Sequence, residues 1–547
     1  MAVRVDTLVP GLCLNDDSSP IFCEVLATSV HIEDGTSVAL DRRESDAARR
    51  KPFLHPITWQ LKSEAGGLRG ERMQPSMFNV KVPLADRNEV FLMNTFSDAQ
   101  LLVSPDVAAL LKRAGEPSTV FTEDETDALD SLAENGFLVS SRDSERRSLE
   151  EYFRSVREDR DELRVTVLTT LQCNFACDYC IQGDHGDHNL FARKMSLDTA
   201  EHVAEWIERK LDDIQPTKFV LTFFGGEPLL NLPVTYFLSE RCHELAEARG
   251  VKLIINVITN GLLLTPEVVD RLLPFGLNGV KVTLDGDRDT HNRMRPLRGR
   301  QGTFDRIVEN MRRVAGKVRM TIGGNFDETS VESFPALLDF LSEQDFADKL
   351  AKVSFKPIIK TTPATPPPPK GFIPLTAVGA NGKPLGGSCM TTAGAGTSVG
   401  SACDTCHFVD EKMTFLREET RKRGFPTVDG VHMGPCEIHR KHAYTIGTDG
   451  DLFACPGFAG EASESVGHVN GGQLSWQAAA AARFEALAPY KKCGDCSFIP
   501  VCAGGCSVAS HNELGDMNAP SCHKGSFEAA LVSLAHVVAS GVENSIL

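Results

Sequence analysis

The sequence predicts an α/β protein built on a parallel barrel, with a small α+β module before the barrel and a cysteine-rich domain after it. From residue 164 to 358, strand-like and helix-like segments alternate in the βαβ rhythm of a parallel barrel. Residues 76–143 instead group short strands before helices, and residues 431–547 hold seven closely spaced cysteines. A chain of 547 residues also exceeds what one hydrophobic core usually covers, so we expect several domains.

Composition limits the classes of partner. The 57 basic and 74 acidic residues give a net charge of −17, which argues against broad contact with a nucleic-acid backbone. No apolar run approaches the length of about eighteen residues that a membrane helix needs, and no secretory signal is recognisable at the N-terminus. We therefore expect a cytoplasmic protein that binds neither nucleic acid nor membrane. The 16 cysteines, many in short-spaced sets, then indicate metal ligands rather than disulfides.

The N-terminal third shows two different patterns. Residues 1–75 have weak periodicity and no recognisable chemistry. We therefore expect either a flexible N-terminal extension or a segment that precedes the natural translation start. Strands are then predicted at residues 78–82, 90–94 and 99–103, helices at 107–113 and 123–135, and a wing strand at 137–139. This order is similar to the winged-helix leader-recognition domain of enzymes that modify ribosomal peptides. A structural cap without a ligand is the alternative, and a charged linker helix over 144–163 follows.

The first strand of the barrel leads into a cysteine loop. Residues 164–170 are rich in β-branched side chains, and Cys173-x3-Cys177-x2-Cys180 follows directly. Three thiolates on one tight loop can hold three irons of a four-iron cubane and leave the fourth iron open. Such a loop would lie at the carboxyl end of a strand, where α/β barrels keep their chemistry. A zinc knuckle is the alternative, although zinc prefers four ligands and C-x2-C pairs.

The strand, the three cysteines and Tyr179 before the last of them resemble the signature of radical S-adenosylmethionine (SAM) enzymes. The resemblance implies that Cys173, Cys177 and Cys180 hold a [4Fe–4S] cluster whose open iron chelates SAM. It also implies that the reduced cluster cleaves SAM to a 5′-deoxyadenosyl radical, with electrons from an external donor of the flavodoxin or ferredoxin type.

The second strand, residues 218–224, runs into Gly225-Gly226-Glu227-Pro228. Two glycines at a strand end allow the backbone to approach a small ligand closely. In a chain that already carries the cysteine loop, this motif resembles the site for the methionine amine of SAM in the same family.

Later strand ends also carry polar residues. The fourth strand, residues 279–284, contains Thr283, and the resemblance implies that a hydroxyl at this position contacts SAM. The fifth strand, residues 318–323, leads to Asn325, which the resemblance implies is a further cofactor contact. Asp285 either caps its turn or transfers a proton, and capping is the favoured interpretation. His291 and Arg295 brace the loop or touch substrate. A sixth strand at 352–357 would complete a six-stranded partial barrel.

A second cysteine field follows a Pro- and Gly-rich linker over residues 359–430. Strands at 444–446 and 452–454 are predicted to form a hairpin around Gly450. The spacing from Cys436 onward resembles the SPASM extension of radical SAM maturases, which carries two auxiliary [4Fe–4S] clusters, making three in all. By that resemblance one auxiliary cluster uses Cys436, Cys455 and Cys506, with Cys406 or Cys403 as a fourth ligand or with an open iron, and the other uses Cys493, Cys496, Cys502 and Cys522.

Together these features predict a radical SAM/SPASM oxidoreductase that abstracts hydrogen from a residue of a ribosomally synthesised precursor peptide and so installs a crosslink or another modification. Two alternatives stay open. One is a maturase of the anaerobic sulfatase type, which converts a residue of a folded protein to formylglycine and needs no leader-binding module. The other is a non-catalytic iron–sulfur scaffold for electron transfer.

Overall fold

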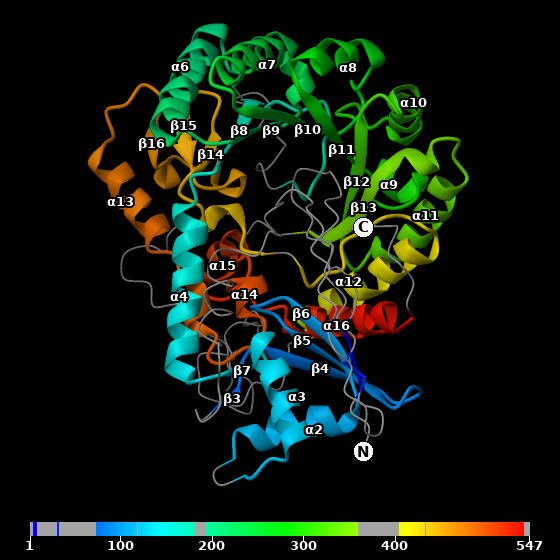
Figure 1. Ribbon diagram of the computed structural model, residues 1–547. Coiled ribbons are helices and arrows are strands. Elements are labelled where there is room, and N and C mark those ends of the chain that lie inside the picture. Colours follow the sequence, from blue (N-terminus) through cyan, green and yellow to red (C-terminus); the bar gives the residue numbers. More distant parts are fainter. Residues whose placement is uncertain are drawn as a thin grey trace, which may run out of the picture.

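The computed structural model describes residues 4–7, 30–31, 73–116, 119–180, 193–358, 404–432 and 434–540. Within these residues the chain forms a nine-stranded mixed sheet, a five-stranded sheet and a two-stranded ribbon. Figure 1 shows the large sheet and its helices above the five-stranded sheet, with the C-terminal helix between them. No helix among the described residues is both long and apolar enough to cross a lipid bilayer.

Six parallel strands form the predicted partial barrel, in sequence order across the sheet. They are β8 (Glu162–Thr170), β9 (Lys218–Gly225), β10 (Lys252–Thr259), β11 (Leu277–Thr283), β12 (Arg319–Phe326) and β13 (Leu350–Pro357). The helices along this part of the chain are α6 (Leu197–Ile214), α7 (Leu232–Glu247), α8 (Pro266–Leu272), α9 (Arg288–Met294), α10 (Phe304–Val314) and α11 (Phe334–Ser342). This arrangement confirms the predicted α/β class and the parallel barrel.

Side-chain alternation explains how the barrel is built. Along β11, Val280 and Val282 are buried in the core that also contains Ile307 and Met311 of α10. Successive side chains of a strand point to opposite faces, so Lys281 and Thr283 lie on the other, concave face of the sheet. The barrel therefore has an apolar outer layer beneath its helices and a more polar interior.

The C-terminal region adds three strands to the barrel sheet. They are β14 (Ala443–Ile446), β15 (Asp451–Phe453) and β16 (Gly467–His468). The hairpin predicted around Gly450 is present: Ile446 pairs with Leu452, and Gly450 has a φ of +93°. The sequence did not predict that β14 pairs in parallel with β8, with Ala443 opposite Arg164. The strand that carries the cysteine loop is thus joined to the second cysteine field by main-chain hydrogen bonds.

The N-terminal module contains β4 (Asn79–Leu84), β5 (Glu89–Asn94), β6 (Ala99–Val103), α2 (Pro105–Ala114) and α3 (Glu123–Glu134). A two-stranded ribbon pairs β7 (Leu138–Val139) with β3 (Gln74–Pro75). Two short strands from the N-terminal extension, β1 (Arg4–Thr7) and β2 (Val30–His31), continue the sheet in the order β2-β1-β6-β5-β4. Parts of the extension that the sequence left without structure therefore pair with the module.

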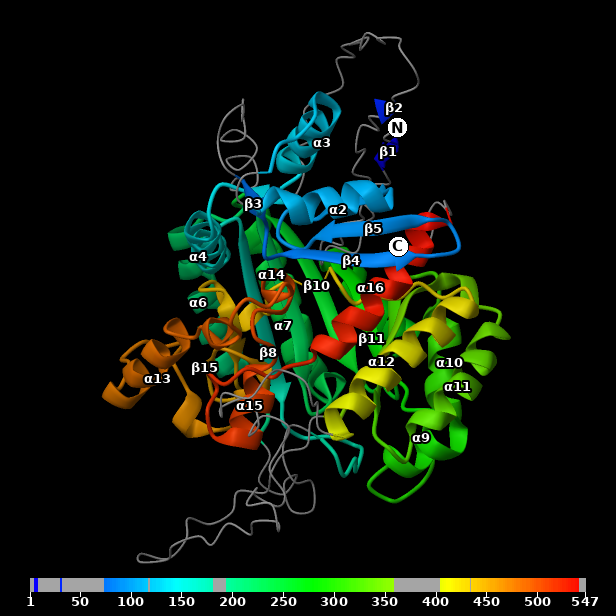
Figure 2. The same ribbon diagram turned by 90° about the horizontal axis from the view of Figure 1, so that it is seen from below.

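Helices from distant parts of the chain join the module to the rest. Helix α4 (Arg142–Glu158) follows the ribbon, and Phe153 on it stacks on Tyr490 with ring centroids 4.0 Å apart. Helix α16 (Lys524–Ala539) packs under β4 and β5, where Leu531 and Leu534 share one core with Phe91. Figure 2 shows α16 between the module and α12 (Asp404–Lys422). The remaining helices of this region are α13 (Ser475–Glu485), α14 (Ile499–Cys502) and α15 (Ser507–Leu514).

Candidate active site

The cysteine loop is held by the segment that follows α9. The backbone N–H of Ala176 donates to the carbonyl of Pro296 at 2.9 Å, and that of Arg298 donates to the carbonyl of Asn174 at 3.2 Å. Phe175 is fully buried and forms an isolated bridge with Leu297. The loop therefore has a fixed path at the carboxyl end of β8.

The three thiols of this loop lie close enough to influence one another. Burial raises the pKa of Cys173 to about 12, with further contributions from the charges of Glu227, Cys177 and Cys180. Burial likewise raises the pKa of Cys177 to about 11, and Arg295 opposes the rise. Neighbouring buried thiolates repel one another unless a cation binds them, and a coordinating metal keeps thiols deprotonated. This donor set fits an iron–sulfur cluster.

The two glycines at the end of β9, Gly225 and Gly226, are required by the fold for a reason that the sequence did not reveal. A Cβ at Gly225, where φ is +134°, would lie 2.2 Å from the carbonyl oxygen of Thr170, and a Cβ at Gly226 would lie 2.2 Å from that of Gln172. The N–H of Gly226 donates to the first of these carbonyls at 2.8 Å. Glycine is therefore required where the end of β9 crosses the start of the cysteine loop. The predicted contact of these residues with SAM stays a prediction.

Glu227 is fully buried and joins the end of β9 to the end of β10. Its carboxylate accepts hydrogen bonds from the N–H of Leu229 at 3.0 Å, the hydroxyl of Thr259 at 2.8 Å and the N–H of Asn260 at 2.8 Å. Burial raises its pKa, against these hydrogen bonds. Asn260 in turn donates to the side chain of Asn174 at 2.7 Å and lies 3.9 Å from the sulfur of Cys173. Glu227 thus positions the end of β10 against the cysteine loop, while the neighbouring Pro228 is buried and begins a short 3-10 helix.

Asp285 is the centre of a second buried network. Its carboxylate accepts a hydrogen bond from the hydroxyl of Tyr179 and others from the N–H and side-chain amide of Asn325, at 2.6 and 3.3 Å. Arg295 donates to the Tyr179 hydroxyl at 2.6 Å and lies 3.4 Å from the carboxylate. The carboxylate therefore connects the cysteine loop with β12 and the end of α9, a wider role than capping its own turn.

His291 supports this network from behind. Burial, followed by the charge of Arg295, holds its pKa well below the usual value, so the ring is neutral. Its Nδ1 accepts from the N–H of Asp285 at 3.1 Å, which leaves the proton on Nε2, 3.1 Å from the hydroxyl of Thr303. That hydroxyl donates to the carbonyl of Arg295 at 2.9 Å. His291 and Arg295 thus brace the loop in this geometry, and their predicted contact with substrate stays a prediction.

The remaining predicted cofactor contacts lie at the mouth of the barrel. Thr283 is half-buried on the concave face of β11 and pairs with Gly323 of β12. Asn325 lies two residues further along β12 and is held by Asp285. Sequence reasoning singled out Tyr179, Asp285 and Arg295 separately but missed their contact with one another.

The second cysteine field divides into two groups in space. Burial raises the pKa of Cys455 to about 12, with contributions from the nearby thiols of Cys436 and Cys506. The pKa of Cys493 is also raised to about 12 by burial, and the thiols near it belong to Cys502, Cys496 and Cys522. In the part of the chain that the structure describes, no three Cys, His, Asp or Glu side chains converge closely enough for a single metal ion. A four-iron cluster spaces its thiols more widely, because each thiol binds a different iron.

The fourth ligand of the first group stays a prediction. Cys406 lies in the first turn of α12, but its side chain is outside what the structure describes, and Cys403 lies outside the described residues altogether.

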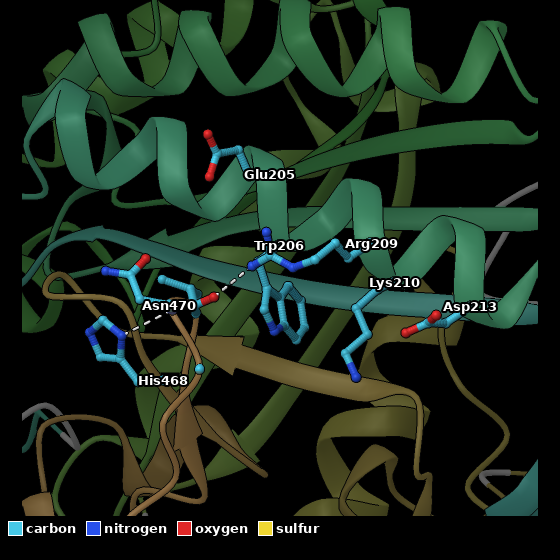
Figure 3. A pocket seen from close by; sticks show the side chains of 9 residues that line it. Glu205, Trp206, Arg209, Lys210, Asp213, His468 and Asn470 are labelled. Carbon is cyan, nitrogen blue, oxygen red and sulfur yellow. Dashed lines mark hydrogen bonds between the residues drawn. The ribbon is translucent and has the colours of Figure 1, made fainter.

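A separate hollow of about 410 Å³ lies outside the barrel, between α6 and the turn after β16. Figure 3 shows Trp206, Lys210 and Asp213 of α6 on one side and His468 and Asn470 on the other. Trp206 packs edge-on against Tyr444 of β14, with ring centroids 4.9 Å apart. The hollow marks the join between the barrel and the added strands, and none of its lining residues belongs to the cysteine loop.

Comparison with known proteins identifies the central part of the chain. Residues 167–341 match the model of the Radical SAM superfamily. This segment begins within β8, ends within α11 and contains the cysteine loop and both buried networks. The chain therefore carries a radical SAM domain, the class of fold that uses SAM and a [4Fe–4S] cluster.

Two curated relatives cover only parts of the chain. Fe-coproporphyrin III synthase of Methanosarcina barkeri is 24% identical over 188 residues, which are 34% of this chain and 41% of that protein. GTP 3′,8-cyclase of Staphylococcus aureus is 33% identical over 130 residues, 24% of this chain and 35% of that protein. The chain thus spans less than half the length of these relatives.

Solved structures match over a longer range. The structure of native anSMEcpe with bound AdoMet is 16% identical and covers 69% of this chain and 99% of its own, with a TM-score of 0.49. That of Streptococcus suis SuiB bound to the precursor peptide SuiA is 14% identical and covers 82% of this chain and 98% of its own, with a TM-score of 0.43.

Proposed function

We propose that this protein is a radical SAM peptide maturase, which abstracts a hydrogen atom from a residue of a ribosomally made precursor peptide. One observation carries the proposal: a radical SAM cysteine loop, braced at the mouth of the barrel, shares one chain with two further groups of neighbouring thiols. Thiols in such numbers fit auxiliary iron–sulfur clusters, which a simple SAM-cleaving enzyme does not need.

In the proposed reaction, Cys173, Cys177 and Cys180 hold the [4Fe–4S] cluster. When bound, the cluster and SAM supply a 5′-deoxyadenosyl radical. The chain's own part is positioning: Glu227 and Asp285 hold the loop against β10 and β12, which fixes the reacting groups and limits water at the mouth of the barrel. Gly225, Gly226, Thr283 and Asn325 stay the proposed SAM contacts.

We assign the second cysteine field to two auxiliary [4Fe–4S] clusters. Cys436, Cys455 and Cys506, closed by Cys406, would hold one cluster, and Cys493, Cys496, Cys502 and Cys522 the other. These clusters would accept the electron released when the substrate radical is oxidised. A flavodoxin or ferredoxin in the cytoplasm would supply the electron that starts the reaction.

The N-terminal module is the proposed site of peptide capture. Within residues 76–143, β6 is an edge strand of the sheet formed by β4, β5 and β6. In the whole chain, β1 occupies this edge and pairs with β6 from Val5 to Thr7 in antiparallel register. An edge that accepts one extended segment can accept another through the same main-chain hydrogen bonds. A folded protein substrate would not need such an edge, which favours a peptide over the sulfatase-maturase alternative.

The test uses the reconstituted enzyme without oxygen, supplied with SAM and dithionite. We expect formation of 5′-deoxyadenosine, and, with a precursor peptide found among the short reading frames beside this gene, a mass change at one residue of that peptide. Replacing Cys173, Cys177 and Cys180 together by Ala should abolish both. SAM cleavage without a mass change in any such peptide would refute peptide maturation, and no SAM cleavage at all would favour the electron-transfer scaffold.

A further inference from the structure

Three lysines lie on the concave face of the barrel, on strands β11 and β13. Lys281 lies on β11, and Lys352 and Lys356 lie on β13, at the far edge of the six-stranded arc from β8. Figure 1 shows β8 and β13 on opposite sides of the arc. We call these three residues the lysine wall.

The lysine wall surrounds Gly323 of β12, which is the strand between β11 and β13. Lys281 pairs with Thr321, yet its Cε would be only 2.5 Å from a Cβ at Gly323, two residues nearer the carboxyl end. The side chain therefore leans toward the mouth of the barrel and occupies the space that glycine leaves. On the other side of β12, Lys352 pairs with Thr321 and Lys356 pairs with Asn325.

The charges of the lysine wall are close and of one sign. Burial lowers the pKa of Lys281 to about 8, and the positive charges of Lys356 and Lys352 lower it further. Within the described part of the chain, the Lys281 amino group makes no ion pair or hydrogen bond. Three cations gathered in a partly buried place repel one another unless an anion lies among them.

We propose that the lysine wall binds a carboxylate of the peptide substrate and so orients the peptide inside the barrel. This inference rests on the proposed peptide-maturase function and adds the chemistry of the substrate: an acidic side chain or a free C-terminal carboxylate near the residue that is modified. The methionine end of SAM is expected at the cysteine loop and the end of β9, while the proposed SAM contacts Thr283 and Asn325 lie beside Lys281 and Lys356, so a carboxylate held by Lys281 would lie next to bound SAM. Orientation by a fixed charge pair places one C–H bond near the radical.

The experiment measures the Lys281 pKa in the reconstituted enzyme after dimethylation of its lysines with a 13C label. The Lys281 resonance is identified by its loss in the Lys281→Arg protein. With SAM at saturation and the cluster kept oxidised, three short probes are added: acetyl-Gly-Glu-Gly-amide, acetyl-triglycine with a free carboxyl end, and acetyl-Gly-Gln-Gly-amide. At least one of the two charged probes should raise the Lys281 pKa by about 1, because a nearby carboxylate stabilises the ammonium form. The neutral probe should leave it unchanged.

The two charged probes separate an acidic side chain from a C-terminus as the source of the carboxylate. Lys281→Met should weaken the effective charged probe about tenfold, the equivalent of one pKa unit, while Lys281→Arg should retain its binding. Lys349→Met is the matched control, because Lys349 is an exposed lysine just before β13, and it should not change probe binding.

Two results would overturn the inference. In the first, neither charged probe changes the Lys281 pKa. In the second, SAM alone raises that pKa and the probes add nothing, which would assign the lysine wall to the carboxylate of SAM. Either result would leave the test of SAM cleavage and peptide modification untouched, so the two proposals can fail separately.

Discussion

At the scale of single residues, Asp285 shows what the sequence can and cannot reveal about this site. A carboxylate before glycine at the end of a strand was recognisable as a candidate, as were Tyr179 and Arg295. Their contact depends on residues 106 and 10 positions apart meeting at the barrel mouth, which no local pattern encodes. Similarly, the glycines after β9 were recognisable as a motif, but their close approach to the backbone of Thr170 and Gln172 follows only from the fold.

The bracing role of Asp285 can be separated from proton transfer by measuring stability. Asp285→Asn leaves Arg295 buried without a charged partner, and we expect the free energy of unfolding to fall by about 3–5 kcal/mol. Thermal and denaturant unfolding of the reconstituted enzyme measure this loss. Unchanged stability, combined with lost peptide turnover, would instead support proton transfer. The control is Asp345→Asn, which breaks an exposed ion pair with Arg312 and should change stability by less than about 1 kcal/mol.

At the scale of elements, His432 fastens the turn between β5 and β6 to the segment after α12. Its Nε2 lies 2.7 Å from the carboxylate of Asp98 and 3.2 Å from the side-chain amide of Gln100, and its Nδ1 contacts the carboxylate of Asp429. Burial alone would lower its pKa, but the charges of Asp98 and Asp429 outweigh burial and raise the pKa well above its usual value.

This histidine should make stability depend on pH. A histidine whose pKa is raised by folding stabilises the folded protein. This stabilisation is fully present at a pH below the pKa of the unfolded state, about 6.5, and is lost as the pH rises through the pKa of the folded state. The difference in melting temperature between the natural protein and His432→Gln should therefore be largest near pH 6 and shrink in alkaline solution. A difference that does not vary with pH would contradict a charged His432.

The strand β1 gives a second prediction for an element. Because β1 pairs with β6 at the edge proposed for peptide capture, it should compete with the precursor peptide. Removing residues 1–72 should strengthen precursor binding, measured by fluorescence anisotropy of a labelled peptide. Val5→Pro keeps the full length but disturbs the β1 pairing, and it should act in the same direction. Removing residues 76–143 should weaken binding by orders of magnitude while SAM cleavage without peptide persists. Unchanged affinity in all three proteins would move peptide recognition away from this sheet.

At the scale of the whole molecule, the strands and helices of the module and the barrel and the spacings of the cysteines were predictable, because each depends on neighbouring residues. The joining of these parts was not. The pairing of β14 with β8 and the packing of α16 under β4 bring together segments hundreds of residues apart, through backbone groups and ordinary apolar side chains that carry no recognisable motif.

Iron content tests the assembly as a whole. If all three thiol groups hold four-iron clusters, the reconstituted protein should bind about twelve irons, and replacing Cys173, Cys177 and Cys180 together by Ala should leave about eight. Cys406→Ala should lower the content further only if that residue closes the first auxiliary cluster. Buried Cys242, which lies in α7 among apolar residues, provides the matched control, since Cys242→Ala should leave the iron content unchanged. Saturation at about four irons in an active preparation would refute the auxiliary clusters.

The pairing of β14 with β8 also limits how this protein could be divided. A radical SAM domain cut free before residue 431 would leave the backbone of β8 from Arg164 to Val167 without its partner on one side. An unpaired edge of that kind invites association with other chains. The barrel of this protein is therefore not an independent domain, because its first strand needs the C-terminal hairpin as a pairing partner. Truncated proteins should aggregate even when the core of the barrel is complete.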